Sequence, residues 1–470
     1  MNKNKLSAGV KIGYGFGTLG ECIAMNTFFI YFIFFLTNAA GIPASVAGTI
    51  AAISVFWGAF TDMFAGVKSD ASRNPVGRRR PFIFKAAIPL GIVTFLMYTD
   101  FSGFSDGARF AYFLIASMVF WLSLSFTDIP YLSLGSEISD DYEERNTIRA
   151  IANVLNYLGM IVASSGTLVI VMKFSGKAGT SDPKGWMAVG IIFGMLTLIA
   201  YYISAISTKG KEAEFIPSTT EKGQQTGFFK SCKEVLALKP YRYILVYIVF
   251  GYGAVLLFTS IYIYYLTYNM GFSETQSATV MLVYSIMVIV ISSILASIGV
   301  KIEKKTIVCA STFVLGVVMI VCKYTGLSGP LLYVVFFLFA LAVSAYFIQI
   351  YSMIYDICDV DEYKYGGGRD GIIISLFYFF GKIISGISMF AVGWILTFAN
   401  YDPEAWPAPQ QTLDGIATGA MLLPGIGFVI AAIVMLKYPI NKKNFAALRE
   451  AIERKQAGEP YSEEGFKELL

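Results

Sequence analysis

Twelve apolar segments, each long enough to cross a lipid bilayer, follow one another along the 470-residue sequence. A helix needs about 20 apolar residues to span the hydrocarbon layer. The composition agrees, because 56% of the residues are hydrophobic and 14% are charged, whereas soluble domains contain about 25% charged residues. We therefore expect an all-α membrane protein, whose predicted spans are residues 12–36, 46–68, 82–101, 110–135, 149–172, 186–207, 243–268, 276–299, 306–324, 330–355, 371–398 and 413–438.

Basic residues are distributed unequally between the loops on the two sides of the predicted helices. If both termini lie on one side, the segments on that side contain 30 of the 36 Lys and Arg residues, and the opposite side contains five. Cytoplasmic loops are enriched in Lys and Arg, so we expect both termini in the cytoplasm. The first apolar run is too long for a signal peptide, which predicts a multi-pass protein of the plasma (inner) membrane.

The composition also excludes several kinds of chemistry. Histidine is absent, which excludes a histidine proton relay or a histidine-bound metal, and the five cysteines show neither metal-binding nor disulfide spacing. The sequence offers no nucleophile–base pair, so we do not expect an enzyme. The net charge of +4 is too small to argue for nucleic acid. We expect no cofactor and no bound metal, and a monomer whose partners are a small molecule and the bilayer.

A polar segment after the sixth span divides the chain into two sets of six spans. The first span of each half ends in a similar string, Phe35-Leu36-Thr37 in one and Tyr265-Leu266-Thr267 in the other. Repeated bundles around a central cavity are typical of transporters. The predicted domains are an N-terminal six-helix bundle 1–207, a cytoplasmic linker 208–242, a C-terminal six-helix bundle 243–440 and a cytoplasmic tail 441–470. We expect a short amphipathic helix of the tail on the inner surface, and a regulatory role for it stays open.

Four ionisable side chains interrupt the apolar spans, namely Glu21, Asp62, Asp128 and Lys382. A charge inside a bilayer costs at least ~2.5–3.5 kcal/mol, so such residues usually face a polar path through the protein. Helical spacing places Asp128 on the same face of its span as Trp121 and Ser125. The pattern predicts a transporter that couples substrate movement to a cation. A purely structural pair with an aspartate is the alternative for Lys382.

The loop after the second span combines glycine, aspartate and arginine. Gly66 and Asp70 are followed by Gly77-Arg78-Arg79. A carboxylate at a helix end and a guanidinium group can latch neighbouring helices on the inner face in one transport state. This arrangement resembles the signature loop of the major facilitator superfamily, with a few residues inserted before the second glycine. An ordinary basic cytoplasmic loop is the alternative.

Longer strings extend the resemblance over nearly the whole chain. They are Gly13-Tyr14-Gly15-Phe16-Gly17, Thr127-Asp128-Ile129-Pro130 followed by Glu143-Glu144-Arg145-Asn146, the acids Asp356, Asp359 and Asp361 with Arg369, and Phe379-Phe380-Gly381-Lys382. In this order they resemble the glycoside–pentoside–hexuronide:cation symporters, whose best-known member is the melibiose permease. The resemblance implies a major facilitator fold of twelve transmembrane helices in two bundles. It also implies that Asp62 and Ser125 bind the coupling cation, that Asp128 binds sugar hydroxyls, and that Lys382 lies beside both sites.

The sequence departs from the family pattern at three places. Gly58 replaces the first of two acids in the second span, Glu21-Cys22 replaces a basic–acidic pair, and Asn153 replaces an arginine. Hard metal cations prefer several oxygen ligands, whereas one carboxylate suffices to carry a proton. The departures favour H+ as the coupling ion, with Na+ as the alternative, and they argue against melibiose itself as the substrate.

We therefore predict a cation-coupled symporter that imports a sugar, either a glycoside or an oligosaccharide, by alternating access. The alternatives are a transporter of lysolipids or other amphiphiles with the same fold, and a receptor or scaffold that transports nothing. Polar helix faces argue against the first, and the missing large cytosolic domain argues against the second. The predicted residues are Asp62 (which would also hold Na+), Ser125 and Asp128 for the cation; Tyr14, Glu21, Trp121, Asp128, Asn153, Asn156, Gln349 and Lys382 for the substrate; and Asp70, Arg78 and Arg79 for the latch.

Overall fold

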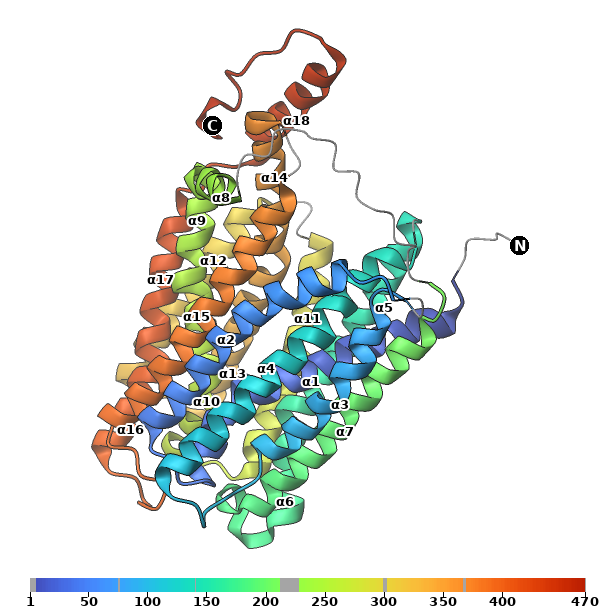
Figure 1. The fold of residues 1–470 in the computed structure, drawn as a ribbon. Coiled ribbons are helices and arrows are strands. Elements are labelled where there is room, and N and C mark those ends of the chain that lie inside the picture. Colours follow the sequence, from blue (N-terminus) through green and yellow to red (C-terminus); the bar gives the residue numbers. More distant parts are fainter. Residues whose placement is uncertain are drawn as a thin grey trace. The chain divides into compact units, whose positions relative to one another are not determined.

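The computed structural model describes residues 6–74, 77–139, 141–211, 228–298, 302–366 and 369–469, and its regular structure within these ranges is helical (Figure 1). These ranges contain 12 helices that are long and apolar enough to cross a membrane. The predicted all-α class and the predicted number of spans are therefore confirmed. The described residues divide into two compact units.

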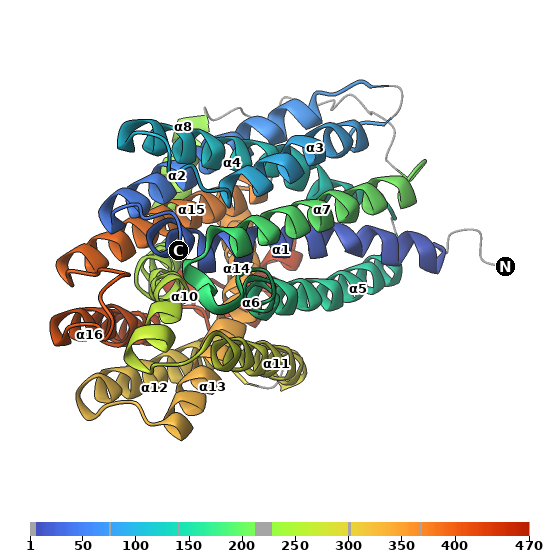
Figure 2. The same cartoon turned by 90° about the horizontal axis from the view of Figure 1, so that it is seen from below.

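The first unit contains Met1–Ser218, Thr259–Ser285 and Ser385–Ala417. Its central helix α1 (Ala8–Asn38) packs chiefly on α5 and α7, and Figure 2 shows α1 between them. Apolar residues surround α1 on every side, and such a helix must be buried by its neighbours. The other helices that begin in this unit are α2 (Ala44–Asp70), α3 (Arg80–Met97), α4 (Asp106–Glu137), α5 (Tyr142–Ile161), α6 (Thr167–Ser175), α7 (Pro183–Ser207), α11 (Glu274–Ile298) and α16 (Gln410–Ala417).

The second unit contains Thr219–Phe258, Ile286–Ile384 and Thr418–Leu470. Its helix α12 packs on α13 and α17, and α14 packs on α18 (Figure 1). The helices that begin in this unit are α8 (Phe228–Ala237), α9 (Lys239–Tyr247), α10 (Gly253–Tyr264), α12 (Lys304–Thr325), α13 (Gly329–Ala345), α14 (Tyr351–Tyr365), α15 (Asp370–Phe398), α17 (Leu423–Leu436) and α18 (Lys442–Ala457). One-turn π-helical segments join several of these helices into longer spans, for example Tyr346–Ile350 between α13 and α14.

Glycines allow helix pairs within each unit to approach closely. Gly91 of α3 faces Gly194 of α7 in the first unit, and Gly316 of α12 faces Gly425 of α17 in the second. A Cβ atom on Gly316 would lie 2.7 Å from the carbonyl oxygen of Gly425, closer than side chains normally approach. Lipid tails are as apolar as leucine, so close backbone packing is a main source of helix association in membranes.

The tenth span is longer than the sequence predicts. Its apolar pattern ends at residue 355, whereas the helix that begins at Gly329 continues to Tyr365. The acids at its end have basic partners, because Lys304 Nζ lies 2.6 Å from Asp356 and Arg369 forms an ion pair with Asp361. Pairing of these charges lets the helix continue beyond the apolar pattern.

The linker and the tail are partly helical. Helix α8 lies in the predicted linker 208–242, of which residues 212–227 lie outside the described ranges. The tail contains α18, whose start is capped by Asn441. Leu448 on α18 is buried and Arg449 pairs with Asp359 of α14, so this helix packs against the second unit. The division into two six-helix bundles and the cytoplasmic location of both termini stay predictions.

Candidate functional site

Asp62 and Ser125 are in direct contact in the first unit. Ser125 on α4 donates a hydrogen bond to Asp62 Oδ1 on α2 at 2.5 Å, and its Oγ lies 2.8 Å from the hydroxyl of Thr61. Thr61 and Ser125 are buried. A carboxylate and two hydroxyl groups therefore form one polar cluster between two membrane-spanning helices. Such a cluster can accept a cation or a proton.

Asp128 lies one turn after Ser125 on α4 and belongs to a neighbouring cluster of tyrosines. Tyr201 of α7 donates to Asp128 Oδ1 at 3.5 Å, and both Asp128 and Glu21 act electrostatically on Tyr201. The ring of Tyr14 stacks on Tyr131 with 4.6 Å between centroids. The first unit thus brings together Tyr14, Glu21 and Asp128 among the predicted substrate residues. Carboxylates and tyrosine hydroxyls are suited to binding sugar hydroxyl groups.

Trp121 is fully buried in the first unit. Its ring meets Phe28, Phe29 and Phe120 at centroid distances of 5.3 to 5.9 Å. A Cβ atom on Gly58 would lie 2.9 Å from the Trp121 ring, so the indole fills the space at the position where the family pattern has an acid. In this conformation aromatic side chains cover Trp121, and its role in stacking on a sugar stays a prediction.

The remaining predicted substrate residues lie in both units. On α5, Asn153 is exposed and Asn156 is half-buried in the first unit. In the second unit, Gln349 is buried on the π-turn before α14, and Lys382 is half-buried on α15. Whether Gln349 and Lys382 meet the acids of the first unit stays a prediction.

The predicted latch residues meet at the ends of α2, α3 and α4. Arg79 binds Asp70 at 2.5 Å, and it also donates to Glu137 at 3.1 Å and to Ser69 at 2.7 Å. Arg78 forms a second ion pair with Glu137. Charge-assisted bonds of this kind are about twice as strong as neutral ones, so the two arginines connect three helix ends.

The family string before α15 forms a comparable ionic network in the second unit. Arg369 binds both carboxylate oxygens of Asp361, at 2.5 and 3.0 Å, and forms an ion pair with Glu234 of α8. These hydrogen bonds, above all those to Asp361, hold the pKa of Arg369 above its ordinary value. The guanidinium therefore stays charged and connects the linker helix to the end of α14.

A hydrogen-bonded group of tyrosines occupies the opposite end of α1 from the Lys11–Glu144 ion pair. Asn38 Oδ1 accepts hydrogen bonds from Tyr268 at 2.9 Å and from Tyr401 at 2.7 Å. The first unit therefore ties the end of α1 to Tyr268 of the seventh span and to Tyr401, which follows the eleventh span.

Sequence reasoning did not include Thr61, Tyr201 and Glu137 in the site. Thr61 carries a usable signal, because it precedes Asp62 and hydroxyl groups often support buried carboxylates. Tyr201 has no local signal, since its position opposite Asp128 depends on how α7 packs. Glu137 lies at the end of α4, where an acid opposite the Arg78–Arg79 pair could have been anticipated. Within the described ranges, no group of three or more Cys, Asp or Glu side chains is arranged to hold a metal ion.

These helices and polar clusters define a polytopic membrane transporter. Its sequence matches the family model described as MFS/sugar transport protein over residues 13–442, and the chain belongs to this major facilitator family. It is 26% identical to the uncharacterized symporter YjmB of Bacillus subtilis (strain 168), over 96% of this chain and 97% of the relative. A protein of Escherichia coli (strain K12) provisionally named a sulfoquinovose importer is 25% identical, over 98% of this chain and 97% of that relative.

A solved structure of a D-xylose–proton symporter has a similar fold. The TM-score is 0.66 and the identity 12%, with 92% of this chain and 97% of that chain covered. This similarity confirms the major facilitator fold, and the family model and the relatives confirm the resemblance to glycoside–cation symporters. The protein is a multi-pass protein of the plasma membrane.

Proposed function

We propose that the protein imports a neutral glycoside or oligosaccharide together with a proton by alternating access, with both termini in the cytoplasm. The contact between Asp62 and Ser125 carries this proposal, because it pairs a carboxylate with a hydroxyl donor between two spans. Asp62 is half-buried within a membrane span, where a carboxylate without a transport role would be an expensive feature. Sodium at Asp62 is the alternative to the proton.

The surroundings of Asp62 support a proton as the coupling ion. The family pattern has a second acid where this chain has Gly58, and the ring of Trp121 fills the space beside that glycine. A second carboxylate therefore has no room at this position. Hard metal cations prefer several oxygen ligands, so the substitution disfavours a metal ion more than it disfavours a proton.

The cluster around Asp128 is the proposed binding site for sugar hydroxyls. Asp128 can accept two such hydrogen bonds, and Tyr14 and Tyr201 lie beside it. Glu21, Asn153 and Asn156 belong to the same unit and complete the proposed site, and the roles of Trp121, Gln349 and Lys382 in sugar binding stay predictions. The arrangement is polar, which favours a sugar over a lysolipid.

Coupling requires that the sugar and the cation cross the membrane together. In the proposed cycle the cation binds at Asp62 first and offsets its negative charge, the sugar binds next, and the empty carrier and the fully loaded carrier change conformation more readily than a half-loaded one. One positive charge that moves down 100 mV releases ~2.3 kcal/mol, which supports roughly 50-fold accumulation of a neutral sugar.

An acidic sugar is a second candidate substrate. Arg149 on α5 acts electrostatically on Tyr14, which places a positive charge near the proposed sugar site. One relative is provisionally named an importer of sulfoquinovose, a sugar that carries a sulfonate group. A sulfonate or a uronate would pair with Arg149, whereas a neutral glycoside needs no cation.

Uptake into proteoliposomes tests the proposal. Labelled glycosides, oligosaccharides, uronides and sulfonated sugars would be supplied while the pH and sodium gradients are imposed independently. We expect uptake of a glycoside that follows an inward proton gradient without sodium. Strict sodium dependence contradicts proton coupling, and uptake limited to acidic sugars contradicts the neutral substrate.

Asp62→Asn tests the cation site in the same vesicles. The variant should lose gradient-driven accumulation, roughly 50-fold at 100 mV, while it retains exchange of labelled for unlabelled sugar. Asp106→Asn, at the exposed start of the same helix α4 that carries Ser125, is the matched control and should accumulate normally. Normal accumulation by Asp62→Asn would refute the assigned role of Asp62.

A further inference from the structure

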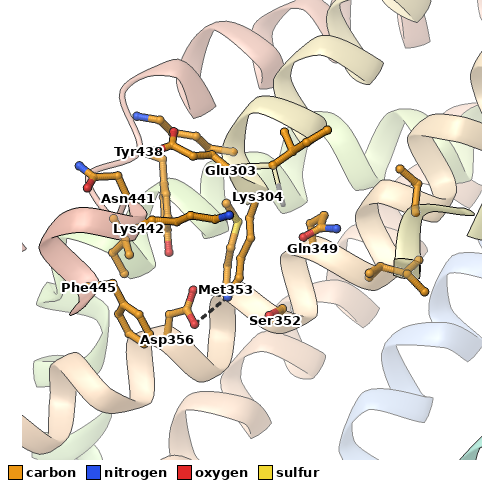
Figure 3. A pocket seen from close by; sticks show the side chains of 16 residues that line it. Glu303, Lys304, Gln349, Ser352, Met353, Asp356, Tyr438, Asn441, Lys442 and Phe445 are labelled. Atoms are coloured by element: carbon orange, nitrogen blue, oxygen red, sulfur yellow. Dashed lines mark hydrogen bonds and ion pairs between the residues drawn. The ribbon is translucent and has the colours of Figure 1, made fainter. Parts of the chain in front are cut away.

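A pocket with a cavity volume of about 440 Å³ lies in the second unit, at the helix ends next to the tail. Figure 3 shows Lys304 and Lys442 extending into it from different helices. The volume falls within the range of about 300–1,000 Å³ that is usual for small-molecule sites. The pocket is lined by Leu295, Ala296, Ile302, Glu303, Lys304, Lys305, Ile348, Gln349, Ser352, Met353, Asp356, Tyr438, Ile440, Asn441, Lys442 and Phe445.

The charged lining of the pocket favours an anion. Lys304 is neutralised by Asp356, with Nζ–carboxylate distances of 2.6 and 2.8 Å. Two further lysines, Lys305 and Lys442, line the pocket against one further acid, Glu303. Helices α12 and α18 also begin at the pocket, and the N-terminal end of a helix carries partial positive charge.

The apolar lining favours an amphiphile over a free anion. Seven apolar side chains line the pocket together with the lysines, and one of them, Ile302, is 41% exposed. Helix α11 continues from this point as an exposed apolar stripe, because Ile286, Val290 and Ile294 follow one another at intervals of four residues. A spacing of four places them on one helix face, along which an acyl chain can lie.

We propose that this pocket binds the headgroup of an acidic phospholipid, with its phosphate between Lys305 and Lys442 and its acyl chains along α11. Basic pockets between membrane helices on the cytoplasmic side are suited to anionic lipid headgroups. Phe445 and Lys442 belong to the start of α18, so a bound lipid would hold the tail helix against α12 and α14. The pocket lies in the second unit and includes Gln349, which the sequence also predicts for the substrate site, whereas the proposed cation residues Asp62 and Ser125 belong to the first unit.

Native mass spectrometry of the full-length protein in neutral detergent tests the proposal. Phosphatidylglycerol and phosphatidylcholine with identical acyl chains would be titrated separately. We expect tighter binding of phosphatidylglycerol, weakened on the order of 30-fold in Lys305→Gln/Lys442→Gln, because a lysine near an anionic lipid contributes the equivalent of about fivefold in affinity. Phosphatidylcholine binding should not change.

Matched variants separate this site from general surface charge. Lys443→Gln removes the same charge one residue further along α18, outside the pocket lining, and should change phosphatidylglycerol binding less than about threefold. The double variant Lys305→Arg/Lys442→Arg keeps both positive charges and should retain binding. It is the control for the effect of substituting both residues at once. Equal losses in Lys443→Gln and in the glutamine pair would overturn the proposal, as would undiminished binding in the glutamine pair.

A competition arm distinguishes a lipid from a free phosphate. Inorganic phosphate and glycerol phosphate share the anion but lack acyl chains. We expect neither to displace phosphatidylglycerol at millimolar concentration. Displacement by inorganic phosphate would show a site for a soluble phosphate and would contradict the lipid assignment.

Discussion

Ser125 offers a single-residue test of which ion is coupled. Its hydroxyl donates to Asp62 at 2.5 Å, and a hydrogen bond to a charged group contributes about 1.5–3 kcal/mol. In Ser125→Ala the charged carboxylate loses this stabilising donor. If the coupling ion is H+, the proton concentration that half-saturates uptake should fall by about tenfold or more. Initial uptake rates across a pH series measure this change.

Ser125→Thr keeps the hydroxyl and is the control for the alanine variant. A metal ion would respond in the opposite direction, because Ser125→Ala removes an oxygen ligand and weakens binding. A rise in the half-saturating sodium concentration, with an unchanged pH profile, would therefore refute the proton proposal.

Trp121 is expected to stabilise the fold more than it binds substrate. It is fully buried against Phe28, Phe29 and Phe120 of the first unit. Trp121→Ala should reduce the free energy of unfolding by about 3–5 kcal/mol, whereas Trp121→Phe should cost less and leave the half-saturating sugar concentration within about threefold. Thermal unfolding and uptake kinetics of both variants check this. Weaker sugar binding in Trp121→Phe at unchanged stability would favour stacking on the sugar instead.

At the scale of elements, Arg79 holds the ends of α2, α3 and α4 together. The guanidinium is buried and contacts Asp70, Glu137 and Ser69. Removing one partner of a buried ion pair typically costs about 3–5 kcal/mol when the other charge is left uncompensated. The cost in Arg79→Gln should be smaller, because Arg78 still pairs with Glu137 and Asp70 is exposed. We expect Arg79→Gln to slow net uptake at least tenfold by weakening the conformation that holds these ends together. Sugar binding to the purified variant should stay within about threefold.

Lys85→Gln is the control for Arg79→Gln, because Lys85 is an exposed cation on the same helix α3. A double variant with Glu137→Gln should be less impaired than the sum of the single variants, since each removes the same contact. Additive effects would show that Arg79 and Glu137 act independently.

The ends of the elements show where hydropathy stops being informative. The apolar pattern ended the tenth span at residue 355, while the helix continues to Tyr365. The partners that permit this, Lys304 and Arg369, lie 52 and 8 residues away from the acids they bind. Apolar periodicity does not record ion pairs, whether the partner is as near as Arg369 or as far as Lys304, so the boundary could not be predicted from it.

At the scale of the whole molecule, hydropathy predicts the number of spans, because this number depends on the length and composition of each segment. All 12 spans are recognisable because each needs only its own apolar residues. Helical spacing places Ser125 and Asp128 on one face of α4, but it does not show which neighbour covers that face. The burial of Trp121 depends on Phe28 and Phe29 of α1, and it could not be predicted from α4 alone.

At the scale of the whole molecule, the proposed alternating access predicts that loss of the Asn38 hydrogen bonds changes the conformational equilibrium. Asn38 accepts hydrogen bonds from Tyr268 and Tyr401 at the predicted outer end of the first unit. Each such bond contributes about 0.5–1.5 kcal/mol, so Asn38→Ala should shift the conformational equilibrium by about 5- to 150-fold towards a state open on the outer side. A cysteine that replaces buried Ser260, in a background without the five native cysteines, reports this opening.

A membrane-impermeant maleimide added from outside should modify this cysteine several-fold faster in Asn38→Ala. Thr49→Ala is the control, because the Thr49 hydroxyl bonds the Ser45 carbonyl within its own helix α2. Substitution there removes a hydroxyl without loosening contacts between spans. Equal labelling rates with and without Asn38→Ala would show that the tyrosine group packs the helices without controlling access, and the closing contacts would then have to lie elsewhere along the first unit.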